Sequence, residues 1–327
     1  MATEVIKTIK PSGGDYTSLS AWEAGEQRDL VTADEIAVAE CYAMADTTAV
    51  VLDGWTTSST QYIKIYTPPS ERHDGKWNTS KYYLRVNSQQ VIAIAEQYVV
   101  IDGIQAEVTE SWVSARSVIH VNSSGASNGQ IDINNCILQP GNTNTDGGYG
   151  INLPYVFGLT GATVNVSNSI IQGFFDTGGQ GIGISEADFS LNVYNSVITN
   201  NETGINQSAG TVTITNCAIF NNTTDVTGTM TVTYTASDDT ISGTGNIDWD
   251  SGSTDWNANF TDYSNGDFSI KDTGADIYNA GTDLSGSGVT DDIIGTARPQ
   301  STNYDIGAFE LIVGASGPTI VHSMAGR

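Results

Sequence analysis

The sequence has few basic residues, few cysteines and no long hydrophobic run. Its 327 residues include 12 Lys and Arg against 37 Asp and Glu, which gives a net charge of −25. Nucleic acid and anionic membranes would repel such a chain, so neither is expected as a partner. The three cysteines are odd in number and indicate small core residues rather than a redox or metal site. No apolar stretch is long enough to span a bilayer.

The first residues lack the features of a secretory leader. Met1 to Glu4 contain no basic group, and no apolar segment follows them. We therefore expect that a leader has been removed or that the protein leaves its cell by release in a virus particle. Both routes predict a location on a virion surface or outside the cell.

What the sequence does contain is a repeat. Four segments share a short β-rich stretch, an Asn, and a second apolar stretch that begins with Ser or Cys. The four Asn residues are 33, 27 and 21 residues apart; they are Asn135, Asn168, Asn195 and Asn216. An earlier copy has Asp102-Gly103 at the same point. A constant strand–turn–strand unit with one loop of variable length is typical of a coiled solenoid.

The recurring Asn has a physical reason. A sharp bend between two strands needs a residue with positive φ, which Gly and Asn adopt at the lowest cost. Stacked coils would place the four Asn residues in one column, about 4.8 Å apart, which is the ordinary strand spacing. The sequence therefore predicts a structural Asn ladder along one corner of the solenoid.

These copies resemble the coils of the right-handed parallel β-helix of pectin-lyase-like proteins, in which an Asn ladder occupies a short turn between two sheets. Gly13–Gly25 resembles the helix that caps the open end in that family, and Asp292–Glu310 resembles the closing signature of many β-helix repeat proteins. The resemblance implies an all-β fold: a right-handed parallel β-helix solenoid with a short N-terminal capping helix. It implies little about activity, because this fold carries many functions.

We expect a single β-helix domain over residues 1–310. Its N-terminal cap is expected at about 1–30, its coils at about 35–235, and an irregular acidic section at 236–310. The last strands are expected at Phe268–Ile270 and Ile306–Phe309. The tail, residues 311–327, is expected to cover the final coil or to contact another subunit, because a solenoid must shield its ends.

The catalytic sets of the family's enzymes are only partly matched. Asn144-Thr145-Asp146 resembles one acidic segment of the polygalacturonase-like group, but no His lies between glycines and no Arg-x-Lys follows. A pectate-lyase-like mechanism would need a Ca²⁺-binding group of acids and an Arg base. From Asn135 to Val226 there is no Lys or Arg.

If the chain is an enzyme, its acids are expected to be Asp146, Asp176, Glu186 and Asp188. The last three flank the predicted strand Gly181–Ser185, where we expect them to share a groove and act as an acid–base pair. The alternative is that they are ordinary solvated acids of a strongly acidic protein. No metal-ligand set or cofactor motif is found, and Ca²⁺ binding by the acidic loops is left open.

Aromatic residues favour a different ligand. An exposed ring with nearby amides and acids is a typical platform for a sugar, through stacking and hydrogen bonds. The glycan-binding candidates lie in or beside the two longest coils; they are Tyr149, Tyr155, Phe174 and Phe175.

The preferred hypothesis is a non-enzymatic structural β-helix on a phage virion, as a capsid decoration or tail-associated spike that contacts host glycans. It would form a homotrimer, with other virion proteins or surface glycans as partners. Two alternatives stay open: a polysaccharide depolymerase or lyase of the pectin-lyase-like fold, and a bacterial surface adhesin.

Overall fold

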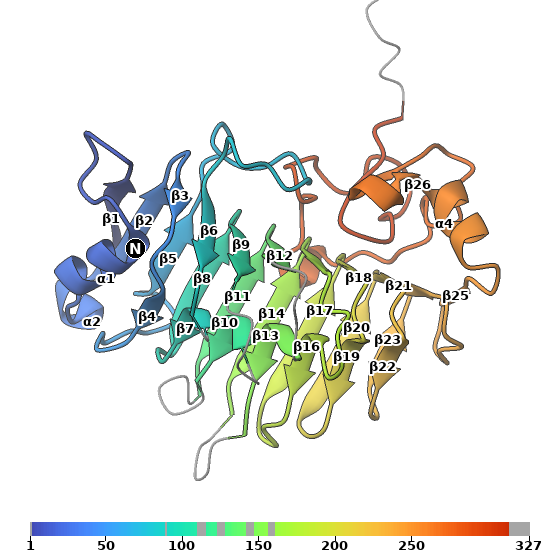
Figure 1. Ribbon diagram of the computed structural model, residues 1–327, viewed down its shortest axis with the longest axis horizontal. Helices are drawn as coiled ribbons and strands as arrows, with labels where there is room; N and C mark the ends of the chain where they lie inside the picture. The colour runs from blue at the N-terminus through green and yellow to red at the C-terminus, as the bar shows by residue number, and fades with distance from the viewer. Residues whose placement is uncertain are drawn as a thin grey trace, which may run out of the picture.

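The computed structural model describes residues 2–88, 90–109, 116–122, 128–141, 147–155 and 161–313. Its strands stack into three long parallel sheets, here called sheets I, II and III (Figure 1). The chain passes from sheet I to II to III and back, so that each circuit forms one coil. The predicted all-β parallel solenoid is confirmed. None of the helices among the described residues has the length and apolar character that crossing a membrane requires.

The strands of each sheet follow one another along the solenoid axis. Sheet I contains β1 (Thr3–Ile9), β2 (Glu35–Cys41), β5 (Ile63–Tyr66), β8 (Tyr98–Asp102), β11 (Gln130–Asn134), β14 (Thr163–Ser167), β17 (Ser190–Tyr194), β20 (Thr211–Thr215) and β23 (Thr231–Thr233). Sheet II contains β3 (Ala45–Asp46), β6 (Tyr83–Val86), β9 (Gln105–Val108), β12 (Ile137–Pro140), β15 (Ile170–Gln172), β18 (Val197–Thr199), β21 (Ala218–Phe220), β24 (Ala236–Ser237) and β25 (Ile247–Asp248). Sheet III contains β4 (Val50–Leu52), β7 (Gln90–Ile94), β10 (Arg116–Val121), β13 (Gly148–Leu153), β16 (Gln180–Ile184), β19 (Thr203–Gln207) and β22 (Thr224–Thr227).

Alternation of apolar and polar residues gives each strand an inner and an outer face. In β11, Ile131 and Ile133 are fully buried while Gln130 is exposed. The same inward position is Val164 in β14 and Leu191 in β17, paired in register. Burial of each such side chain contributes about 1.5–3 kcal/mol, so every coil adds a layer to one continuous core. The three cysteines are buried and unpaired, as expected for core residues.

The predicted capping helix is present as α1 (Leu19–Glu26). The side chain of Ser18 accepts a hydrogen bond from the Ala21 N–H, which satisfies a free donor at the helix start. Leu19 and Trp22 are fully buried, and the Trp22 ring stacks on Trp55 at 5.5 Å. A second short helix that the sequence did not predict follows at α2 (Leu30–Ala33).

The corner between sheets I and II is built from the four repeat Asn residues. All have positive φ, at 56°, 48°, 41° and 58° for Asn135, Asn168, Asn195 and Asn216. Each follows a residue that is paired in register between neighbouring coils, so the four form one column. The Nδ2 of Asn216 donates to the Oδ1 of Asn195 at 3.2 Å.

The C-terminal section packs against the outer face of sheet II, where Figure 1 shows it in orange. It contains α4 (Ser253–Asn259), the antiparallel pair β26 (Phe260–Asp262) and β27 (Asp267–Ile270), and two 3₁₀ turns, Tyr263–Asn265 and Ser285–Ser287. This section packs around Phe220 of β21, whose ring lies 5.2 Å from Phe260 and 5.3 Å from Trp256. The predicted strand Phe268–Ile270 is confirmed within β27, but the expectation of otherwise irregular loops missed this second core.

Residues 277–310, here called the C-terminal strap, lie across the Asn corner. The Nδ2 of Asn168 donates to the carbonyl of Asp291 at 2.8 Å, and that of Asn195 to the carbonyl of Asp305 at 2.9 Å. The predicted strand Ile306–Phe309 is wrong. Its backbone amides instead bond singly to distant carbonyls, Ile306 to Ile277 and Gly307 to Asn216, so no ladder forms.

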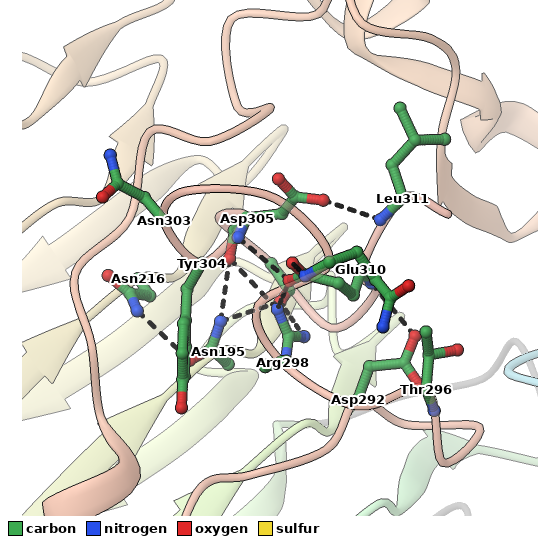
Figure 2. Close-up of polar contacts among 12 residues, drawn as sticks. Asn195, Asn216, Asp292, Thr296, Arg298, Asn303, Tyr304, Asp305, Glu310 and Leu311 are labelled. Carbon is green, nitrogen blue, oxygen red and sulfur yellow. Dashed lines mark hydrogen bonds and ion pairs between the residues drawn. The ribbon is translucent and has the colours of Figure 1, made fainter. Parts of the chain in front are cut away.

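Figure 2 shows how the strap is held around a buried arginine. Arg298 donates to Glu310 Oε2 at 2.9 Å and to the carbonyl of Gly307 at 3.0 Å. The second oxygen of Glu310 accepts the Gln300 N–H, and Asp292 accepts the Glu310 N–H. The segment that resembles a closing signature therefore forms a compact hydrogen-bonded turn structure around Arg298.

Candidate functional site

The sequence-predicted site residues lie around sheet III. Asp176, Phe174 and Phe175 are in the connection from β15 to β16, and Glu186 and Asp188 are in the connection from β16 to β17. Asp146 lies outside the described residues.

The structure separates the candidate acids. Asp176 precedes β16, and Glu186 and Asp188 follow it. Five strand residues at about 3.3 Å each place the two ends roughly 16 Å apart, whereas the carboxyl pairs of glycosidases lie about 5–10 Å apart. Glu186 is buried, and its Oε1 accepts the Ala187 N–H at 2.9 Å, while Asp188 is exposed. Asp176 lies before β16 and Glu186 and Asp188 lie after it, so the strand geometry does not support the expected shared groove.

The candidate aromatics have different environments. Phe174 is 3% exposed within the main core, so it presents no ring face to a sugar. Tyr149 is half-buried in β13, and its ring lies against Gly183, where an added Cβ would come within 2.7 Å of Tyr149 Cε1. Tyr155 and Phe175 are 59% and 53% exposed. They lie at opposite ends of the sheet III strands, since Tyr155 follows β13 and Phe175 precedes β16.

The outer face of sheet III carries almost no charge. The seven strands contain only two formally charged residues, Arg116 and Asp225, and both are buried. His120 is half-buried, and desolvation lowers the pKa of its ring. Two columns of residues without formal charge run in register along these strands; they are Ser117, Tyr149, Gln180 and Thr203, and His120, Asn152, Gly183 and Asn206. These strands offer no acid paired with a base.

One buried carboxyl group lies on β22, the last strand of sheet III. Burial raises the pKa of Asp225 to about 8, and its Oδ2 accepts hydrogen bonds from the Ser237 hydroxyl and the Asp238 N–H. Asp225 is fully enclosed, so it has no route to a substrate. Within the described residues, no group of three or more His, Cys, Asp or Glu is arranged to hold a metal ion.

Sequence reasoning missed a groove on the outer face of sheet II. Two adjoining hollows of about 400 and 300 Å³ share Gln139, Gln172 and Asn200. The walls come from segments distant in sequence, Gly75–Trp77 and Tyr263–Gly266. One signal was available, because Gln139 and Gln172 occupy the same position in two successive repeats, after Ile-Leu and Ile-Ile.

Comparison of the chain with models of known protein families and with curated proteins gave no match. The coil pattern and the sheet topology support a parallel β-helix architecture on their own.

Proposed function

We propose that this chain is a non-enzymatic structural protein of an exterior surface, assembled as a homotrimer through the outer face of sheet III. The observation that carries the proposal is a face without exposed formal charge on its strands in a chain of net charge −25. Copies of so acidic a protein repel one another. The electrostatic and desolvation cost of association is lowest where the contacting faces carry no charged groups.

Exposed apolar residues support the same face. Val51 on β4 is 53% exposed, and Tyr155, which follows β13, is 59% exposed. Apolar and aromatic side chains within a neutral polar surround are characteristic of protein interfaces. The same neutrality leaves the strands without the acid and base that polysaccharide cleavage requires.

The setting that we propose is a phage particle, where the chain serves as a capsid decoration or tail-associated spike and meets other virion proteins or surface glycans. A rigid coil stack with acidic remaining surfaces suits a soluble component that projects from a particle. An antibody against the chain should label intact purified particles. Label confined to a bacterial envelope would instead support the adhesin alternative.

The assembly is tested by light scattering of the purified protein, with a chain mass of 34.6 kDa as the unit. We expect a trimer, and we expect Thr203→Glu on β19 to dissociate it by placing a charge on the interface. Thr213→Glu is the matched control. Thr213 is also half-buried, but it lies on β20, which belongs to sheet I. A monomeric wild type, or equal effects of the two variants, would contradict the proposal.

The non-enzymatic part is tested by incubation with neutral and acidic polysaccharides. We expect no new reducing ends. Release of reducing ends that Asp176→Ala or Glu186→Ala abolishes would establish the depolymerase alternative.

A further inference from the structure

The groove on sheet II has fixed aromatic walls. Trp77 contacts Tyr83 edge-on, with ring centroids 5.8 Å apart, and Tyr263 contacts Trp256 at 5.4 Å. Both rings pack on the second hydrophobic core but keep part of their surface in the groove lining. Phe175, 53% exposed, lines the adjoining hollow. Figure 1 shows the loop before β6 and the C-terminal section on the same side of the solenoid.

The floor of the groove carries amides in successive coils. Gln172 Nε2 donates to Gln139 Oε1 at 3.4 Å, and Gln139 Nε2 donates to Glu107 Oε2 at 3.2 Å. Neighbouring coils are about 4.8 Å apart along the axis. Each amide has two donor hydrogens and an acceptor oxygen, so it can serve a hydroxyl group in either role.

The charges that line the groove are compensated within the protein. Lys76 Nζ lies 2.7 Å from Asp267 Oδ2, and Glu107 forms an ion pair with Arg85. An anionic polymer finds no free cation there and meets a chain of net charge −25. Aromatic rings beside amides, without uncompensated charge, match a ligand with apolar ring faces and many hydroxyl groups.

We infer that this groove binds an uncharged oligosaccharide whose chain runs along the solenoid axis. Sugar rings stack on the aromatic walls, and their hydroxyls bond to the amides of Gln139, Gln172 and Asn200. The ligand then crosses successive coils, which are about 4.8 Å apart. The inference deepens the proposed function and rests on its exterior setting, but it does not depend on the trimer.

The test is titration calorimetry of the full chain with neutral gluco- and galacto-oligosaccharides, with oligogalacturonate as the acidic comparison. We expect binding of at least one neutral series, weakened about tenfold or more by Gln172→Ala and by Phe175→Ala. Tyr155→Ala is the matched control, because its ring is similarly exposed but lies outside the groove lining. It should leave the affinity unchanged.

Absence of neutral-saccharide binding, preference for the acidic series, or equal loss in Tyr155→Ala would overturn the inference. Light scattering of each variant separates the two proposals. A monomer that binds neutral saccharide through Gln172 would leave the groove assignment standing and remove the trimer. A trimer with no saccharide affinity would leave the trimer standing and overturn the groove assignment.

Discussion

At the corner between sheets I and II, one residue per coil combines a backbone role with a side-chain role. Asn195 has a φ of 41°, its Nδ2 donates to the carbonyl of Asp305, and its Oδ1 accepts from Asn216. Glycine would supply the conformation but not the amide. Alanine lacks the amide as well, and it adopts this backbone conformation only at an energetic cost, because its Cβ disfavours the left-handed region.

The first prediction separates these two roles. Asn195→Ala should lower the free energy of unfolding by about 2–3 kcal/mol, since it loses both the favoured conformation and the buried hydrogen bonds of the side-chain amide. Asn195→Gly should lose about 1 kcal/mol less, because the backbone conformation is retained. Urea unfolding of both variants measures the difference. Equal losses would mean that the backbone conformation contributes nothing.

The second prediction concerns Glu96, beside the N-terminal cap. Its Oε1 accepts the Trp55 N–H at 2.7 Å. Burial raises the pKa of Glu96 to about 7, and the nearby carboxylates of Asp53 and Glu23 add to the rise. The folded protein therefore keeps a proton that the unfolded chain releases at lower pH. The stability from this group is full in acid and is lost as the pH rises from about 4.5 to about 7.

Glu96→Gln should remove this dependence while keeping an acceptor for Trp55. We expect a stability gain on the order of 1 kcal/mol near pH 8 and none near pH 4. Thermal unfolding at both pH values provides the measurement. Asp188→Asn, at an exposed acid, is the control. A gain that is the same at both pH values would contradict the titration of Glu96.

At this scale the sequence predicts what local chemistry determines. The Asn corner could be predicted because positive φ restricts residue type within each repeat. The groove residues Trp77 and Tyr263 could not, because their meeting depends on contacts between segments almost two hundred positions apart. The expected pairing of Asp176 with Glu186 is not supported, because the strand between them is extended and holds its two ends apart.

At the scale of elements, strands were predictable where they alternate and repeat, as in β14, β17 and β20. The strap was not, because its apolar residues alternate like a strand while its amides bond to scattered carbonyls. Its anchor is instead the ion pair of Arg298 and Glu310, whose side chains are 0% and 1% exposed.

The third prediction tests that anchor. Arg298→Met should cost about 3–5 kcal/mol, because it leaves the Glu310 carboxylate buried without its partner. Lys76→Met removes a pair in which the lysine is 47% exposed, and it should cost less than about 1 kcal/mol. Denaturant unfolding compares the two. Similar losses would show that the buried pair is no more important than a surface one.

At the scale of the whole molecule, charge is distributed unevenly. The outer positions of sheet I include Glu4, Lys64 and Asp132, whereas the strands of sheet III expose no formal charge. The composition gives the net charge of −25 but not this distribution, because a net charge does not say which residues share a face.

The fourth prediction follows from that distribution. If copies meet through sheet III against long-range repulsion, salt should favour the trimer. At about 0.01 M salt the Debye length is about 30 Å and the repulsion is felt across the assembly; at about 0.5 M it is largely screened. Sedimentation should therefore show a tighter trimer as salt increases. Dissociation by salt would indicate an interface held by ion pairs instead.

A stack of repeats ordinarily frays from its ends, because each repeat touches only its neighbours and can detach without disturbing the others. In this molecule, residues 277–310 lie over several coils and accept hydrogen bonds from Asn168, Asn195 and Asn216. The last coils can unfold only after the C-terminal strap has detached, and detachment of the strap exposes all three Asn corners at once. The coils beneath it should consequently be lost together in one abrupt step, rather than one by one.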